Sequence, residues 1–331
     1  MAAQQAPWPG APDLQGYVPA AAGAALVVGL VTGELRFRAL RMPPALALLL
    51  SLGALSALTS PAPWIAIPAF IEKTLWVVGA VLLVSLFSPA PARRAALPVL
   101  VLLTFEQIAM ALHQSISLRR EAWGSLGTPN ALARYVLMVW PLVALPLLAS
   151  GKALLRLSGL LLGGALSVVL VLSSSRMAWV AFSVQWLLIV VRWRPKIGVG
   201  VAIAALIGMI VFWHGSLIRA DDMQRIMAWK TALALALQHP LLGTGLGTFG
   251  SYYQLVPPSP TADALQTPHN LLLHLACELG LMSIPLLMWL MAAGWWHLVS
   301  AERRVDRFDG AFLLAARVII VGLAVQSLVE Y

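Results

Sequence analysis

Charged residues are scarce in this chain, and that scarcity decides its class. Only 11% of the 331 residues are Asp, Glu, Lys or Arg, whereas 60% are hydrophobic. A soluble domain carries roughly a quarter charged residues. This chain lacks the polar side chains that would cover a water-facing surface, so a soluble fold is excluded. A bilayer removes that need, because it accepts apolar side chains and demands only internal backbone hydrogen bonds.

Cysteine and acidic residues are also few. The single cysteine, Cys277, excludes an intramolecular disulfide framework and a cysteine-based zinc site, and it is expected to pack as a small apolar residue. Thirteen acidic residues against 22 basic ones give a net charge of +9. The basic residues form short, scattered clusters, which argues against nucleic-acid binding. Because the first sixteen residues contain no Lys or Arg, no cleavable signal peptide is expected.

Long apolar runs dominate what remains, and they predict an all-α polytopic membrane protein. The alternating ten-residue segments of a membrane β-barrel do not occur. A membrane-spanning helix needs about twenty apolar residues. Ten stretches qualify, the first being short, and the chain is expected to form a single integral membrane domain, 1–331. The expected spans are about 17–33, 43–60, 68–88, 95–113, 130–149, 154–172, 176–191, 197–213, 269–298 and 311–331.

Five basic clusters fall in every second connection between these spans. Such alternation is what the positive-inside rule produces, so these connections are assigned to the cytoplasm and the loop 214–268 to the outside. The apolar run that ends at Tyr331 is what a chain continuing into further helices would show. The clusters are Arg36/Arg38/Arg41, Arg93/Arg94, Lys152/Arg156, Arg192/Arg194/Lys196 and Arg303/Arg304/Arg307.

The outer loop begins with an amphipathic segment. Asp221 can cap a helix over about 222–239, and Pro240 ends it. Its apolar side chains share one face, which suits a helix lying on the membrane surface. The glycines that follow, Gly243, Gly245 and Gly247, lack the preceding strand and the lysine of a nucleotide-binding loop. They are instead expected to allow a tight backbone path.

Candidate site residues gather on the outer side of the expected bilayer. The loop returns at Pro268-His269-Asn270, where Pro268 suits the first turn of a helix and places His269 at its mouth. Histidine can take a proton from a hydroxyl near neutral pH, and arginines bind phosphate oxygens in bidentate fashion. The arginines on this side are Arg176, which ends the run Ser173–Arg176, and Arg219 and Arg225. For Arg176 the alternative is a snorkelling side chain.

His274 and Glu278 lie four residues apart and therefore share one face of the ninth span. A packing hydrogen bond and a functional pair are both open for them. Charged residues inside spans are costly and mark ion pairs or polar cavities, and Arg317 raises the same alternative.

These residues together resemble the O-antigen ligase and polymerase superfamily, most closely the O-antigen ligase. The resemblance rests on three stretches, which are Arg225…Trp229…His239–Gly247, Pro268-His269-Asn270…Glu278-Leu279-Gly280, and Ser173–Arg176 together with Thr128–Ala133. It implies a GT-C-like, metal-independent glycosyltransferase with no cofactor. Members usually have about twelve spans, against ten expected here, and a longer outer loop.

The resemblance also implies chemistry and place. The glycan would move from undecaprenyl pyrophosphate to the lipid A core at the periplasmic face of the bacterial inner membrane, with inversion. His269 maps to the catalytic base, Arg176 and Arg225 to the pyrophosphate-binding arginines, and Arg219 to an alternative for the second. Asn270, Glu278 and His274 are supporting positions.

Two other functions stay open at this point. One is a repeat-unit polymerase or protein O-oligosaccharyltransferase, which no residue here separates from a ligase. The other is a lipid-linked glycan transporter, in which ionisable residues should gather near the midplane. The outer position of His269 and the arginines favours the enzyme.

Overall fold

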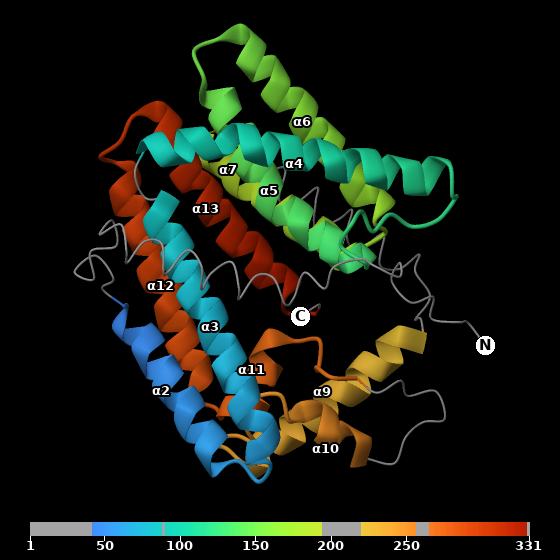
Figure 1. Cartoon of the computed structure of the whole chain (residues 1–331), viewed down its shortest axis with the longest axis vertical. Helices are drawn as coiled ribbons and strands as arrows, with labels where there is room; N and C mark the ends of the chain where they lie inside the picture. The colour runs from blue at the N-terminus through green and yellow to red at the C-terminus, as the bar shows by residue number, and fades with distance from the viewer. Residues whose placement is uncertain (1–41, 88–89, 194–219, 256–264, 330–331) are drawn as a thin grey trace.

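The computed structural model describes residues 42–87, 90–193, 220–255 and 265–329. Within these ranges the chain is helical and contains no strand, so the all-α prediction is confirmed there (Figure 1). The helices are α2 (Pro44–Thr59), α3 (Pro63–Phe87), α4 (Ala90–Ile116), α5 (Pro129–Ala149), α6 (Ala153–Leu172), α7 (Arg176–Trp193), α9 (Ala220–Gln238), α10 (Phe249–Leu255), α11 (Leu271–Leu279), α12 (Ser283–Glu302) and α13 (Arg307–Gln326).

Six of these helices are long and apolar enough to cross a membrane, which fits a polytopic membrane protein. They are the six segments Pro63–Val81, Arg94–Ile116, Pro129–Ala149, Ala153–Leu172, Ser283–Glu302 and Arg307–Gln326. The second expected span is the shorter apolar helix α2, and the seventh, α7, falls outside the six. The spans expected at 17–33 and 197–213 lie outside the described residues. The count of ten therefore stays a prediction.

The expected span 269–298 is wrong as a single helix. The structure breaks it at Gly280, which has φ 87° and ends α11, so that α12 begins at Ser283. A Cβ at Gly280 would collide with the backbone of Leu241, which packs against the break. A helix start at Pro268 is also wrong, because α11 begins at Leu271 with Asn270 as its cap.

Helices α5, α7 and α13 meet in the core, which α4 and α6 also help to form, and a buried glutamine joins the three. Gln185 of α7 accepts a hydrogen bond from Trp140 Nε1 (2.6 Å) and donates to the carbonyls of Leu137 (3.0 Å) and Val318 (3.1 Å). Pro141 has no N–H, so the Leu137 carbonyl lacks its helical donor four residues on. Gln185 supplies that missing donor, which links the kink-prone α5 to both neighbours.

The described members of the basic clusters gather where α4 and α13 begin and where α7 and α12 end. Arg94 lies 2.7 Å from Asp306 and 2.9 Å from Asp309, and Arg192 lies 3.8 Å from Glu302. Arg317, left open by the sequence, also pairs with Glu302. We call this the basic end of the bundle, at upper left in Figure 1. Its composition agrees with the alternation of clusters in the sequence.

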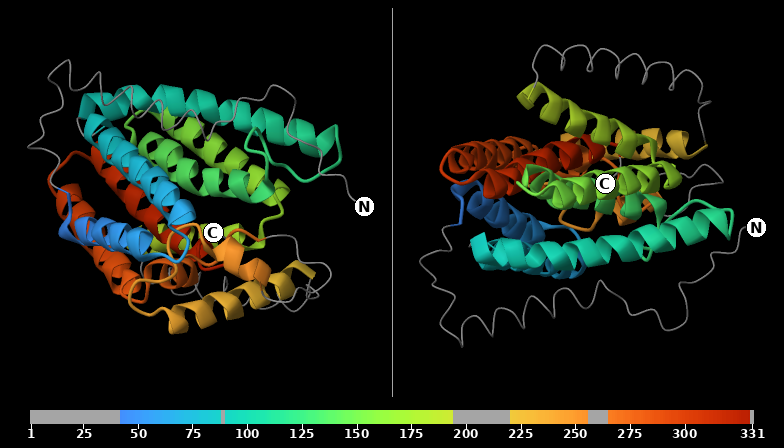
Figure 2. Two further views of the ribbon diagram at one scale, coloured as in Figure 1. Left: turned by 60° about the horizontal axis from the view of Figure 1, so that its bottom comes forward. Right: turned by 90° about the horizontal axis from the view of Figure 1, so that it is seen from above.

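The opposite end, which we call the loop end, is formed by the beginnings of α5 and α7 and the end of α13. Here α9, α10 and α11 gather beside α2 and α3 (Figure 1). They share a small apolar cluster that includes Ala228, Ala232, Phe249 and Cys277. Both views of Figure 2 show α9 on the far side of the molecule from α4. The group formed by α9, α10 and α11 therefore lies next to the end of α13.

Candidate functional site at the loop end

The glycine-rich segment 240–250 wraps around the end of α11. The Thr244 and Gly245 amides donate to the carbonyls of Cys277 (2.9 Å) and Glu278 (3.0 Å). Gly243 and Gly245 have φ values of 67° and 105°, and a Cβ at Gly243 would collide with the Glu278 carbonyl. Only glycine combines this conformation with so close an approach. The tight backbone path expected from the sequence is present.

The buried carboxylate of Glu278 stabilises this turn through hydrogen bonds. Its carboxylate is 1% exposed, accepts hydrogen bonds from the amides of Gly247 (2.8 Å) and Phe249 (3.1 Å), and lies 2.9 Å from His274 Nε2. A buried carboxylate is tolerated only when such donors satisfy its oxygens. The pair His274–Glu278 therefore fixes the geometry of α11 and the glycine turn, as a packing contact would.

Asn270 fixes the other end of α11. Its Oδ1 caps the helix by accepting from the Leu273 amide (3.0 Å), and its Nδ2 donates to the Leu328 carbonyl (2.7 Å). The Leu271 amide also donates to the Ser327 carbonyl (2.8 Å). These contacts anchor the start of α11 to the end of α13, 58 residues away in the chain.

His269 precedes this cap and is held in an uncommon backbone conformation. Its φ is 53°, in the left-handed region that costs an ordinary residue about 1–2 kcal/mol. Such conformations persist only where surrounding contacts enforce them, and they gather at functional sites. The side chain is half-buried.

Arg176 opens α7 directly after the turn Ser173–Ser175. Ser173 Oγ donates to the Leu170 carbonyl (2.7 Å), and Ser174 has a φ of 54°, so the turn is tight. The arginine is half-buried at the beginning of its helix. Anions are favoured at that position by the helix dipole. The location agrees with the boundary expected from the sequence.

Arg176 lies level with the end of α13. Gln185 bonds to Val318 while Arg192 meets Glu302 before α13, so α7 and α13 run antiparallel. Arg176 comes nine residues before Gln185, about 13 Å along a helix, and the end of α13 comes about 12 Å beyond Val318. Since α11 is anchored at that same end, the fold brings Arg176 and His269 to one end of the bundle.

The two remaining arginines are placed less directly. Arg225 lies half-buried near the beginning of α9, one turn before Ala228, with which α9 starts its packing against α11. Arg219 lies outside the described residues, so its role stays a prediction. The helix expected over 222–239 is present as α9. Its position on a membrane surface stays a prediction.

A second basic element at the loop end was missed by the sequence reading. The connection between α4 and α5 is fastened by buried Gln114, which bonds to the Trp123 amide (2.9 Å) and to Gly124 (2.8 Å). It exposes Arg119 and Arg120, the latter 4.2 Å above the Trp123 ring. The Ala122 amide donates to the Leu172 carbonyl (3.0 Å), just before the Ser173–Arg176 turn. The connection that carries Arg119 and Arg120 therefore packs against the end of α6 and adds cationic charge to the loop end.

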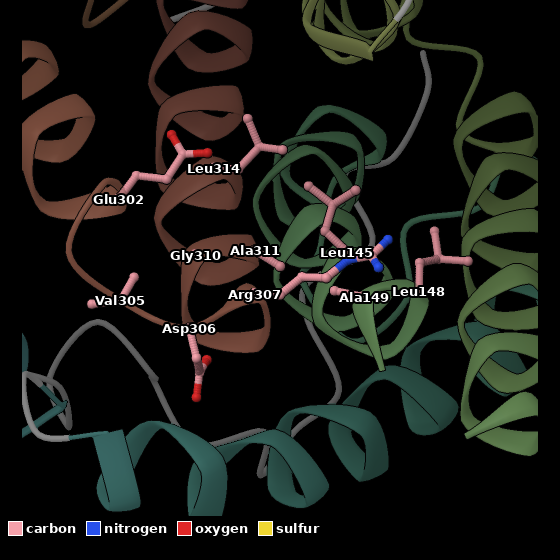
Figure 3. Close-up of a pocket in the computed structure, with 10 residues that line it drawn as sticks. All are labelled: Leu145, Leu148, Ala149, Glu302, Val305, Asp306, Arg307, Gly310, Ala311 and Leu314. Carbon is pink, nitrogen blue, oxygen red and sulfur yellow. The ribbon is translucent and has the colours of Figure 1, made fainter. Parts of the chain in front are cut away.

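A cavity lies at the other end of the bundle. A space of about 260 Å³ opens at the basic end between α5 and α13, lined in part by Leu145, Leu314, Glu302 and Arg307 (Figure 3). It is at the opposite end of α13 from His269 and Arg176, so the cavity takes no part in the candidate site.

The fold and the site define a class, that of polytopic all-α membrane proteins with a histidine and arginines at one end of the bundle. Within that class, residues 159–290 match the O-antigen ligase family model. The match runs from α6 into α12 and includes Arg176, Arg219, Arg225 and His269. No curated protein matches the chain.

The resemblance found in the sequence is thus confirmed over that segment, which is similar to the O-antigen ligase family. At this level the match supports an O-antigen ligase-type or related polymerase function.

Proposed function

We propose that the protein transfers a glycan from undecaprenyl pyrophosphate to the lipid A core at the periplasmic face of the bacterial inner membrane. The observation that carries the proposal is the convergence of Arg176 and His269 at the loop end, inside the segment matched by the family. The basic end lies opposite, and under the positive-inside rule this supports a periplasmic position for the loop end.

The proposed reaction is one in-line displacement. The acceptor hydroxyl oxygen attacks the anomeric carbon while His269 takes the hydroxyl proton, a contribution of about 10²–10⁴ in rate. The bond between the anomeric carbon and the pyrophosphate oxygen breaks, and undecaprenyl pyrophosphate leaves with the electron pair. The configuration at the anomeric carbon inverts.

Arg176 and Arg225 bind the leaving pyrophosphate in this proposal, and Arg219 is the alternative to Arg225. Guanidinium groups pair with phosphate oxygens in bidentate fashion and stabilise the charge that grows there as the bond breaks. Asn270, Glu278 and His274 are positioning residues, because they fasten both ends of α11 and with it the backbone of His269.

The test compares wild type with His269→Asn in detergent, using undecaprenyl-pyrophosphate glycan as donor and lipid A core as acceptor. Asparagine is chosen over alanine because it tolerates the left-handed conformation of His269. We expect transfer to fall about 10²-fold or more in His269→Asn. Arg304→Gln, exposed at the basic end, is the matched control and should transfer at the wild-type rate.

Other results would redirect the proposal. Transfer at the wild-type rate by His269→Asn would remove His269 as the base, and the same result for Arg176→Gln would remove the arginine from pyrophosphate binding. Extension of the donor glycan, without transfer to lipid A core, would make the protein a polymerase. Absence of any new glycosidic bond would favour the transporter. Loss of wild-type activity in EDTA would contradict metal independence.

A further inference from the structure

The cavity at the basic end combines an apolar wall with the exposed guanidinium of Arg307. Leu145 and Leu148 of α5 and Leu314 of α13 line one side. Arg307, the first residue of α13, points its guanidinium over this wall toward Leu145 (Figure 3). The arginine is exposed, and it makes no ion pair with any residue that the structure describes.

The two carboxylates that line the same cavity are already neutralised from outside it. Glu302 pairs with Arg317 and Arg192, and Asp306 pairs with Arg94 at 2.7 Å. Asp306 also caps α13 through the Asp309 amide (2.7 Å), which lowers the pKa of its carboxyl and keeps it ionised. Neither carboxylate therefore needs a cationic ligand, and neither pairs with Arg307.

The charge left over is positive. Within this network four arginines, counting Arg307, face three carboxylates, the third being Asp309. Arg156 adds a cation near the end of α5, where its Nε donates to the carbonyl of Ser150 (2.7 Å), the residue after that helix. A ligand group that pairs with the Arg307 guanidinium must carry a negative charge, and a phosphate can accept two of its N–H groups at once.

The size of the cavity narrows the ligand further. Its 260 Å³ corresponds to about nine water molecules at roughly 30 Å³ each. That space holds a phosphate with a small alcohol, or the first carbons of a chain, and no whole lipid. Beside it, on the first turns of α6, Leu154 and Leu157 are exposed and apolar, a surface along which acyl chains can lie.

We propose that this cavity binds the phosphate of an anionic phospholipid, with Arg307 as its ligand and the acyl chains along α5 and α6. The site lies at the end of α13 opposite His269 and is independent of the donor lipid. A bound lipid would join α5 to α13 at the point where α13 begins. The binding would stabilise the bundle without taking part in glycan transfer.

The test measures lipid retention and thermal unfolding of the full chain in detergent. The probes are dioleoyl phosphatidylglycerol, the matching phosphatidylcholine and phosphatidylethanolamine, and sodium phosphate alone. We expect native mass spectrometry to retain phosphatidylglycerol in preference to the other two lipids, and phosphatidylglycerol to raise the unfolding temperature most. Loss of a charge-assisted hydrogen bond should weaken its binding about tenfold or more in Arg307→Gln.

Two further variants make the test specific. Gly310 lines the cavity, and a Cβ there would meet other atoms only at ordinary contact distances of 3.8 and 3.9 Å. Gly310→Leu should therefore fill the cavity, fold normally and abolish retention of phosphatidylglycerol. Arg304→Gln removes an exposed arginine outside the cavity and should retain the lipid as wild type does.

Three results would overturn the proposal. One is undiminished retention of phosphatidylglycerol in both Arg307→Gln and Gly310→Leu. Another is equal retention of phosphatidylcholine or phosphatidylethanolamine by wild type, which would show that the site does not select lipids by the net negative charge of the headgroup. The third is equal stabilisation by sodium phosphate alone, which would make this a site for free anions and not for lipid.

Discussion

At the scale of single residues, His269 and Glu278 have different roles in the candidate site, one proposed to be chemical and the other structural. His269 has a left-handed backbone conformation just before α11. Glu278 anchors the end of that helix to the glycine-rich segment 240–250. Neither property depends on the chemistry of the other. Loss of Glu278 should therefore loosen the turn first and affect transfer only through the position of α11.

Glu278→Gln tests this division. The amide replaces one acceptor oxygen with an NH₂ group, which cannot accept from both Gly247 and Phe249 while also meeting His274. Each lost bond to the carboxylate is worth about 1.5–3 kcal/mol. We expect faster hydrogen exchange at the Gly247 and Phe249 amides. Glu72→Gln, an exposed carboxylate on α3, should leave both rates unchanged, and equal rates in the two variants would contradict the assignment.

At the scale of elements, the break at Gly280 and the joint at Gln185 are what the sequence did not predict. Hydropathy predicts that α5, α6, α12 and α13 span the bilayer, because each is one apolar run. Hydropathy does not predict the helix break at Gly280, because the apolar run continues through this glycine and its positive φ cannot be read from the sequence. Hydropathy also gives no sign of the joint at Gln185. Its partner is the Leu137 carbonyl of α5, which lacks a helical donor because Pro141 has no N–H.

The candidate site shows the same limit. The sequence identifies His269 and Arg176 by their chemistry and by the family motif. Their placement at one end of the bundle depends on the hydrogen bond from Asn270 to the Leu328 carbonyl, 58 residues away in the chain. Arg119 and Arg120 were within reach of sequence reasoning. They are basic residues in a connection that the positive-inside alternation assigns to the outer side, and such an exception indicates a role.

Gln185→Leu is the prediction for the joint. The variant leaves Trp140 Nε1 and the Leu137 carbonyl unsatisfied, each at about 1–3 kcal/mol, in a residue that is fully buried. We expect a lower unfolding temperature in detergent. Ser183→Ala, exposed on the same helix, should change it little. An unfolding temperature at or above wild type for Gln185→Leu would show that the amide does not hold α5 and α13 together.

At the scale of the whole molecule, the two ends of the bundle differ in charge and in content. One end holds the arginine–carboxylate network and the cavity, and the other holds the candidate site. Glycan transfer in the periplasm requires these ends to lie on opposite sides of the membrane. The proposed function therefore depends on a topology that can be measured directly.

Cysteine labelling in intact cells measures that topology. The native Cys277 is fully buried and should not react, so single cysteines can be added without removing it. Leu241→Cys, highly exposed in the glycine turn, should react with a membrane-impermeant maleimide from outside. Arg304→Cys should react only after the inner membrane is opened. The reverse pattern would invert the orientation and contradict a periplasmic site.

The break at Gly280 has a consequence for the way the protein meets membranes of different thickness. The 20 residues of α12 cover about 30 Å, the depth of one hydrocarbon core. A transmembrane helix answers a thinner bilayer by tilting. Because α11 is a separate helix, fastened to α13 and to the glycine turn, the tilt of α12 is not passed on rigidly to His269. We therefore expect the position of His269 to change little when the bilayer becomes thinner or thicker.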